Sequence, residues 1–290
     1  MTIEGNLYRP PSEANSYILQ ATIGCSWNKC TYCAMYRDKT YRVREVTECV
    51  AELEQVGTLY GDRIRKLFVA DGDSLAMPAE NWVAILKTAQ RCFPHLKQVS
   101  CYALASNVLE KTPAQLRQLR ELGLCLLYIG PESGDDVTLK RIAKGLTAAD
   151  HMAAAQMAHE ADMTLSTIFL LGIAGEERSQ AHAEASADLL TAMDPAFVAT
   201  LTTMVIPDTP LYRKQEKGLF KLPAVEGMLK EIRTIVARSR LSQAVFRTNH
   251  ASNYLPLAGR LPQDQERIVA TIDQALAGKL TLRAEYLRGL

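Results

Sequence analysis

The sequence lacks the features of a secreted or membrane-inserted chain. Its start, MTIEGNLYRPPSEANSY, places acidic residues and prolines where a signal peptide has a basic region followed by an apolar run. No apolar stretch reaches the roughly 18 residues that predict a membrane-spanning helix. We therefore expect a cytoplasmic protein, in which cysteines stay reduced and clustered thiols favour metal binding over disulfides.

The chain also lacks an excess of charge of one sign. Its 33 Lys and Arg residues nearly balance 32 Asp and Glu residues. No strong overall field is therefore expected to recruit nucleic acid or an anionic membrane. Low-complexity linkers and long repeats are missing as well, and a length of 290 residues allows one long domain or two smaller ones.

Short β-like runs alternate with helix-like stretches, which is typical of parallel strands joined by crossover helices. The predicted strands are residues 17–24, 66–71, 99–104, 124–130, 165–172 and 197–205. Helix signals lie between them. Thr112 and Pro113 suit an N-cap and a first helical residue, and Gly123 suits the stop.

After Pro207 the strand rhythm fades. Two helices are predicted there, over residues 223–240 and 262–277, separated by an irregular polar segment. We predict an α/β fold, a six-unit (βα)6 partial TIM barrel with a C-terminal helical extension. The expected divisions are an N-terminal lead (1–16), the barrel core (17–215) and the extension (216–290), a candidate substrate cap.

Three of the seven cysteines, Cys25, Cys30 and Cys33, lie within nine residues in the segment GCSWNKCTYC. The segment follows the first predicted strand, and parallel α/β folds place their chemistry at the carboxyl ends of strands. Three thiolates from one loop can hold a 4Fe-4S cluster and leave one of its irons open. Zinc is the alternative, but a closed zinc site needs further ligands, and no His precedes His95.

The other four cysteines do not cluster in the sequence. Cys49 and Cys92 lie in predicted helices, and Cys101 and Cys125 lie in predicted strands. Because a buried free cysteine behaves as a small hydrophobic residue, we expect these four in the core.

The cysteine segment resembles that of the radical S-adenosylmethionine (SAM) superfamily, in which three cysteines follow the first strand of a βα barrel. The usual pattern is Cys-x3-Cys-x2-Cys; here it is Cys-x4-Cys-x2-Cys, with Tyr32 at the family's aromatic position and therefore among the expected cofactor-binding residues. The resemblance implies a 4Fe-4S cluster whose open iron chelates SAM. It also implies one-electron cleavage of SAM to a 5′-deoxyadenosyl radical that takes a hydrogen atom from the substrate.

Two further turns resemble the family. After the second strand, Asp71, Gly72 and Asp73 stand where the family holds the amino group of SAM, although a simple strand-end turn is the alternative. After the fourth strand, YIGPESGDDVTLKRIAKG resembles the Gly-Leu-Glu-Ser turn of the branch that includes coproporphyrinogen dehydrogenases, methylthiotransferases and elongator-type enzymes.

In the turn after the fourth strand, the resemblance places Glu132 at the ribose or methionyl end of SAM. Ser133 is a cofactor-binding residue that also suits a cap for the following helix. Lys144 is either a partner of the methionyl carboxylate or a solvated charge.

The fifth and sixth strands end in similar signatures. STIFLLGIAGEE resembles the strand that meets adenine, which implies cofactor-binding roles for Ser166 and Gly172, with Ala174 in place of the family's proline. MVIPDTPLY resembles a Pro-Gly-Thr-Pro-Leu turn. Asp208 replaces its glycine, which makes a left-handed backbone less expected there.

The substrate is expected to meet the polar segment between the last two helices, beyond the common core. We predict that His250 and Asn253 face the substrate from a loop over the barrel mouth; a loop that merely joins two helices is the alternative.

No cobalamin-binding domain, cysteine-rich extension or RNA-binding appendage is evident in the sequence. We expect an oxidoreductase or transferase that acts on a small molecule, with an electron donor such as a flavodoxin or ferredoxin and without a membrane or nucleic-acid partner. Two alternatives stay open. One is a 4Fe-4S and SAM-binding factor that handles clusters or haem without radical turnover; the other is a zinc-stabilised α/β binding protein.

Overall fold

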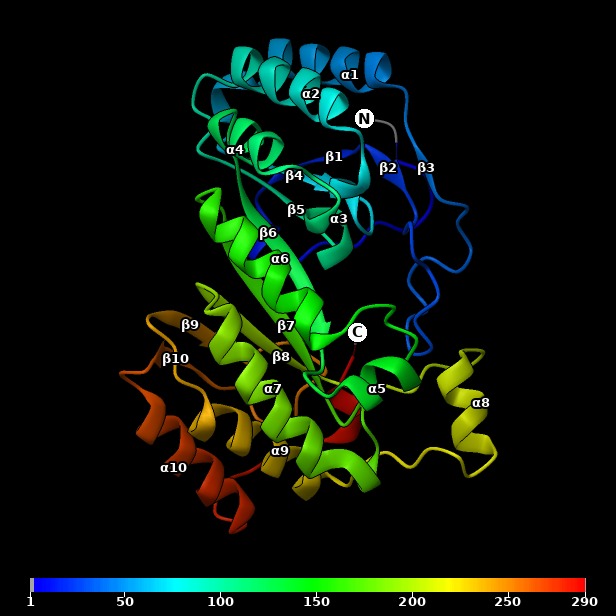
Figure 1. The fold of residues 1–290 in the computed structure, drawn as a ribbon, viewed down its shortest axis with the longest axis vertical. Helices are drawn as coiled ribbons and strands as arrows, with labels where there is room; N and C mark the ends of the chain where they lie inside the picture. Colours follow the sequence, from blue (N-terminus) through cyan, green and yellow to red (C-terminus); the bar gives the residue numbers. More distant parts are fainter. Residues whose placement is uncertain (1–2, 290) are drawn as a thin grey trace. The chain divides into compact units, whose positions relative to one another are not determined.

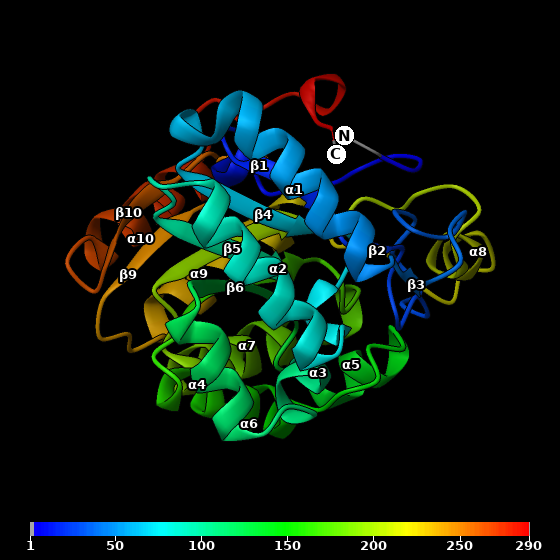
Figure 2. The same cartoon turned by 90° about the horizontal axis from the view of Figure 1, so that it is seen from above.

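The computed structural model describes residues 3–289 (Figures 1 and 2). The chain divides into two compact units. The first unit comprises Met1–Asn28, Ala34–Ile129 and Gln156–Leu165. The second comprises Lys29–Cys33, Gly130–Ala155 and Ser166–Leu290. Within residues 3–289, none of the helices has the length and apolar character needed to cross a membrane.

The first unit is built on parallel strands in the order β1-β4-β5-β6. Their bounds are β1 (Tyr17–Gln20), β4 (Lys66–Ala70), β5 (Gln98–Tyr102) and β6 (Leu124–Glu132). A short antiparallel pair, β2 (Thr22–Ile23) and β3 (Arg42–Val43), flanks the cysteine segment. Strand β4 is an almost continuous apolar run, as expected for a parallel strand covered on both faces.

Helices pack on these strands. They are α1 (Val46–Tyr60), α2 (Ala79–Cys92), α3 (Ala105–Leu109) and α4 (Pro113–Glu121), with 3-10 turns η1 (Pro11–Glu13), η2 (Gly61–Arg63) and η3 (Ser74–Ala76). Helices α1 and α2 lie side by side in both views (Figures 1 and 2). The predicted cap of α4 is confirmed, because Thr112 Oγ1 accepts a 3.2 Å hydrogen bond from Gln115 N and Pro113 opens the helix. Gly123 follows its end with a φ of 103°.

The second unit contains the strand order β7-β8-β9-β10, parallel except for β10. Its strands are β7 (Thr164–Leu171), β8 (Phe197–Thr202), β9 (Ala244–Arg247) and β10 (Ala258–Leu261). Its helices are α5 (Asp136–Arg141), α7 (Ser179–Met193), α8 (Pro210–Glu216), α9 (Val225–Arg238) and α10 (Gln265–Leu276), with 3-10 turns η4 (Glu176–Arg178) and η5 (Glu285–Leu287). Helix α6 (Ala148–Glu160), the end of β6 and the start of β7 divide their residues between the two units. Helix α9 packs against both α7 and α10.

The α/β class and all six predicted strands are confirmed, and α9 and α10 match the two predicted C-terminal helices. The extension also contains β9 and β10, which the sequence did not indicate. These strands, AVFR and AGRL, are four residues long and carry no alternating apolar pattern. Their extended form comes from backbone pairing with β8 and with each other, a tertiary effect that outweighs weak local preference.

Candidate functional site

The cysteine segment contains no disulfide. All seven cysteines are unbonded to one another, and Cys25, Cys30 and Cys33 are half-buried. Cys25 belongs to the first unit, whereas Cys30 and Cys33 belong to the second. Over residues 3–289, no three His, Cys, Asp or Glu side chains are grouped so that they could hold a metal ion. The role of the three cysteines as cluster ligands stays a prediction, and thiolate is the ligand type that a 4Fe-4S cluster requires.

The four other cysteines lie in the elements expected for them. Cys49 and Cys101 are buried, while Cys92 and Cys125 are half-buried. Burial raises the pKa of the Cys125 thiol, which donates to the Val99 carbonyl at 3.5 Å. The prediction of a core position is confirmed for Cys49 and Cys101 and is wrong for Cys92 and Cys125, which are partly exposed.

In the first unit, Gly72 lies directly against Cys25. A Cβ atom on Gly72 would approach the Cys25 Cβ to 2.8 Å and the Tyr36 ring to 2.9 Å, so no other residue fits without displacement. The Gly72 amide donates to the Gly24 carbonyl at 3.0 Å. The family resemblance placed Gly72 where the amino group of SAM is held; the structure shows that its lack of a side chain makes room for the cysteine loop itself.

Asp73 fastens the same loop. The carboxylate is fully buried, and its Oδ1 accepts a 2.8 Å hydrogen bond from Ser26 N, while the Ser26 hydroxyl donates to Oδ2. Burial raises the pKa of Asp73, and hydrogen bonds from Ser26, Cys25 and Asn107 oppose that rise. Asp73 therefore fixes the backbone at Ser26, the residue that follows Cys25.

Asp71 is buried in an ion pair that the sequence did not indicate. Its Oδ2 accepts hydrogen bonds from Lys39 Nζ at 2.7 Å and from Gln20 Nε2 and Gly24 N at 3.1 Å. Its Oδ1 is also buried but has no hydrogen-bond partner in the described part of the chain. Because a buried carboxylate oxygen without a donor is costly, Oδ1 fits an incoming ammonium group.

In the second unit, the backbone of Thr31 ties the segment containing Cys30 and Cys33 to two helices. Thr31 N donates to the Ile142 carbonyl after α5 at 2.8 Å, and its carbonyl accepts from Leu211 N of α8 at 2.9 Å. Burial raises the pKa of the Cys30 thiol; the Lys144 ammonium opposes this rise, and Glu132 and Cys33 add to it.

Glu132 and Lys144 form a buried pair beside these cysteines. Lys144 Nζ donates to Glu132 Oε1 at 3.1 Å, and both residues are buried. Lys144 is therefore not a solvated charge. Glu132 has a left-handed backbone, with a φ of 68°, and its side chain folds over Gly130, where a Cβ atom would lie 2.3 Å from Oε1.

Tyr32 packs on an apolar cluster of the second unit. The cluster consists of Leu139, Ile142, Leu170, Ile173 and Leu211. Burial, together with the charge of Glu132 and a hydrogen bond to it, raises the pKa of Tyr32 well above its usual value. Tyr32 thus stays a neutral phenol that donates to the Glu132 carboxylate.

The turn after β6 differs from expectation at its cap. Asp135, not Ser133, caps α5, because its Oδ2 accepts from Thr138 N at 3.0 Å. Ser133 Oγ instead accepts from Asp135 N at 3.0 Å and bonds His182 Nδ1 at 2.8 Å. Although burial acts to raise it, the pKa of Asp135 is lowered to about 2 by hydrogen bonds from Arg178 and Thr138. The helix begins at Asp136, so Asp135 occupies the N-cap position and Ser133 lies two residues before it.

The remaining residues singled out in the sequence lie on β7 or in the segments that follow β7 and β8. Ser166 is buried on β7, and Gly172 follows the strand with a φ of 81°. The Gly172 amide donates to Glu231 Oε2 of α9 at 2.6 Å. Asp208, expected to disfavour a left-handed backbone, adopts one with a φ of 66°; Asp tolerates this region better than most residues.

Asn253 anchors the loop between β9 and β10. Its Oδ1 accepts from Thr202 Oγ1 at 3.0 Å, and its Nδ2 donates to the carbonyls of Thr200 at 2.7 Å and Thr248 at 3.0 Å. His250 is half-buried, with its Nδ1 2.9 Å from Ser252 Oγ. Asn253 therefore donates one amide hydrogen to β8 and the other to the start of the loop, and its contact with substrate stays a prediction.

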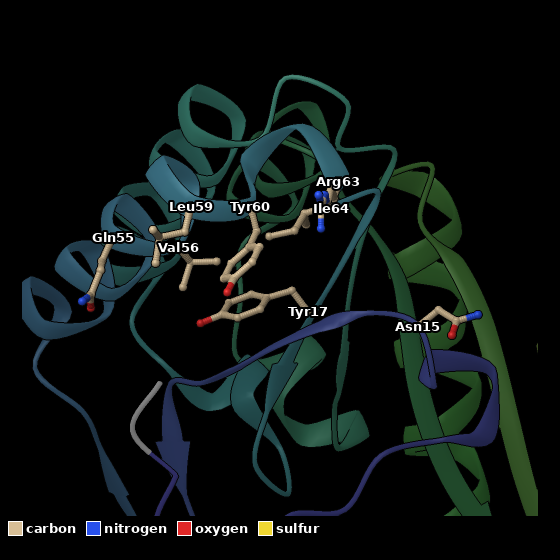
Figure 3. A pocket seen from close by; sticks show the side chains of 8 residues that line it. All are labelled: Asn15, Tyr17, Gln55, Val56, Leu59, Tyr60, Arg63 and Ile64. Carbon is tan, nitrogen blue, oxygen red and sulfur yellow. The ribbon is translucent and has the colours of Figure 1, made fainter.

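A pocket of about 450 Å³ lies elsewhere in the first unit, between the start of β1 and the end of α1 (Figure 3). Its lining residues are Asn15, Tyr17, Gln55, Val56, Leu59, Tyr60, Arg63 and Ile64. Tyr60 points toward Tyr17 across the pocket (Figure 3), and the Tyr17 hydroxyl donates to Glu52 at 2.7 Å. No residue assigned to the cofactor lines this pocket.

Comparison with known proteins identifies the family. The family model described as Radical SAM superfamily matches residues 19–185. The heme chaperone HemW of Bacillus subtilis (strain 168) is 21% identical over 164 residues, which are 56% of this chain and 43% of that protein.

Two solved structures resemble the fold. The radical SAM methyltransferase TsrM from Kitasatospora setae, with cobalamin and a [4Fe-4S] cluster bound, gives a TM-score of 0.58 at 18% identity over 72% of this chain and 41% of that one. Coproporphyrinogen III oxidase (HemN) from Escherichia coli gives 0.55 at 16% identity over 77% and 51%.

The chain spans less than half the length of HemW and TsrM, and the structural likeness at these identities concerns the fold. The family match supports more than a shared fold, because it covers more than half of this chain and contains all three clustered cysteines. It assigns an enzyme whose cofactors are a 4Fe-4S cluster and SAM. The chain belongs to the radical S-adenosylmethionine superfamily.

Proposed function

We propose that the protein cleaves SAM reductively and uses the resulting radical to take a hydrogen atom from a small molecule. The observation that carries this proposal is the presence of three half-buried cysteines, none of them in a disulfide, in one nine-residue segment inside the family match. The cluster supplies the electron for cleavage when it is bound by Cys25, Cys30 and Cys33. The protein orients SAM and keeps water away from the radical.

The first unit would receive the amino group of SAM. The Asp71 Oδ1 atom supports this role, because it is buried and has no donor within residues 3–289. Lys39 already neutralises the other carboxylate oxygen at 2.7 Å, so a second cation at Oδ1 would share one negative charge. Asp73 and Gly72 contribute by holding the cysteine loop beside this position.

We assign the rest of SAM to the turns after β6 and β7. Glu132 suits the ribose hydroxyls as an acceptor, and Lys144 suits the methionyl carboxylate as a donor. Tyr32 and Ser133 hold Glu132 and its turn, through the hydrogen bond to Glu132 and the bond to His182. The glycine backbone at Gly172 would contact adenine at the end of β7, and Ser166, the third residue of β7, would face the cofactor from within the strand.

The test is anaerobic. Purified protein is reconstituted with iron and sulfide, mixed with SAM and dithionite, and assayed for 5′-deoxyadenosine by mass spectrometry. A brown protein that forms this product is the expected result. A colourless protein that retains zinc and makes no product would contradict the proposal, and metal analysis separates the two.

A second function has one observation in its favour. The similarity to the heme chaperone HemW supports a cluster- or haem-handling role without radical turnover. A cluster-loaded protein that binds haem in an absorbance titration, yet forms no 5′-deoxyadenosine, would favour this role over the first.

We propose further that the segment 216–290 caps the substrate, with His250 at the loop that faces it. Asn253 would support this loop from behind. Its Ala variant leaves the Thr202 hydroxyl and two carbonyls unpaired, so we expect a loss of about 2 kcal/mol in the free energy of unfolding. Urea unfolding at neutral pH measures it.

His250→Ala is the matched comparison for that loss. It keeps all the hydrogen bonds of Asn253, so its cost should stay below about 1 kcal/mol. Equal losses in the two variants would argue against Asn253 as the anchor of the loop.

A further inference from the structure

We propose that Glu231 and His182 are positioning residues of the SAM site. Their buried network holds the turns after β6 and β7 in place and so sets the affinity for SAM. This inference rests on the proposed function, which assigns those two turns to SAM. Neither residue belongs to a signature that the sequence offered.

Glu231 joins three elements of the second unit. It lies on α9 and is 1% exposed. Its Oε2 accepts from Gly172 N after β7 at 2.6 Å, and its Oε1 accepts from Ser179 Oγ at the start of α7 at 2.6 Å. This one carboxylate thus accepts a hydrogen bond from the backbone of the turn after β7, and it fixes that turn relative to α7 and α9.

His182 does the same for the turn after β6. The ring is fully buried on α7, with Nδ1 2.8 Å from Ser133 Oγ and 3.3 Å from Ser186 Oγ. Ser186 Oγ in turn accepts from Gly134 N at 2.9 Å. At Gly134 a Cβ atom would lie 2.1 Å from the Ala185 carbonyl, so this turn rests directly on α7.

The two residues also face each other. His182 Nε2 lies 3.9 Å from Glu231 Oε2, beyond hydrogen-bond distance, so the two residues adjoin while each holds its own turn. Burial raises the pKa of Glu231 to about 7, although the hydrogen bonds from Ser179 and Gly172 act to lower it. Burial lowers the pKa of His182 to about 4. Burying two titratable groups here costs stability, whereas apolar residues would pack α9 on α7 without that cost.

The network acts on SAM only through backbone and side chains of the turns. Ser133 is adjacent to Glu132, and Gly172 is the residue assigned to adenine. Groups that fix the direct ligands of a site lower the cost of ordering them on binding. A network that stabilised the fold alone would leave the affinity for SAM unchanged in every variant that still folds.

The experiment measures the Kd for SAM on anaerobically reconstituted protein by equilibrium dialysis at pH 8. Glu231→Ala is expected to bind at least about tenfold more weakly, which corresponds to about 1.4 kcal/mol. Glu231→Gln keeps an oxygen for Gly172 N and a donor for Ser179, so it should stay within about threefold of wild type. Arg233→Ala, which removes an exposed ion pair to Asp273 on the same helix, should not change the Kd.

Wild-type affinity in a folded Glu231→Ala protein would overturn the inference. If that variant does not fold, Ser179→Ala removes one of the two hydrogen bonds to the carboxylate and should weaken binding about threefold; an unchanged Kd would overturn the inference equally. Failure of the reconstituted wild-type protein to bind SAM would instead overturn the proposed function itself, and the inference with it.

Discussion

Reconstituted Cys30→Ala protein is expected to form no detectable 5′-deoxyadenosine from SAM and dithionite. The reason lies in ligand number. A cluster held by two thiolates is labile, and loss of the cluster removes the electron that SAM cleavage needs. Iron content and the visible absorbance of the protein should fall together with product formation.

Cys125→Ala is the matched control for this variant. Cys125 is also half-buried, but it lies on β6 and donates to the Val99 carbonyl. Its removal should leave iron content and product formation close to wild type. Cleavage retained in all three single variants, at Cys25, Cys30 and Cys33, would rule out the assignment of these residues as cluster ligands.

The second large effect is expected at His151, through the pH dependence of stability. His151 is fully buried on α6, and neither ring nitrogen has a hydrogen-bond partner in the part of the chain that the structure describes. Burial, with repulsion from Lys144, lowers its pKa to about 3. The neutral ring is therefore the form present in the folded protein.

The sign of the effect follows from proton binding. As the pH falls below the ordinary pKa of 6.5, the unfolded chain takes up a proton at His151 that the folded protein does not. Stability is therefore lost between about pH 6.5 and pH 3. At about 1.4 kcal/mol per pKa unit, this group contributes a loss of about 2 kcal/mol at pH 5 and about 4 kcal/mol at pH 3.

His151→Leu should remove that loss. Urea unfolding at pH 7.5 and pH 5 is expected to show a decrease in stability smaller than in wild type by about 2 kcal/mol. The variant should also be no less stable than wild type at pH 7.5, because two unpaired polar atoms leave the interior. The difference between the two proteins cancels contributions from other groups, including His182.

His159→Gln provides the control on the same helix. His159 is exposed on α6, so its replacement should leave the difference between the two pH values as in wild type. Identical pH dependence in wild type and His151→Leu would contradict the assignment of a buried neutral ring.

Patterns of adjacent residues predicted helices and strands correctly where those patterns were strong. The apolar run of β4 and the cap at Thr112 are properties of adjacent residues, and both appear as predicted. The same reasoning missed β9 and β10, whose strand form depends on pairing with β8. It also assigned the cap of α5 to Ser133. Ser133 and Asp135 are both polar residues that suit a helix cap, and the residue at which the helix begins makes Asp135 the cap.

The sequence by itself determined the three clustered cysteines, the polar turns at the strand ends and the family to which they point. Only the tertiary structure decided the partners of those residues: Lys39 on Asp71, Lys144 on Glu132, and Glu231 on Gly172. These partners are 32, 12 and 59 positions apart in the chain. Hydrogen bonds and ion pairs depend on distance in space, which residue spacing does not report once the chain has turned back on itself.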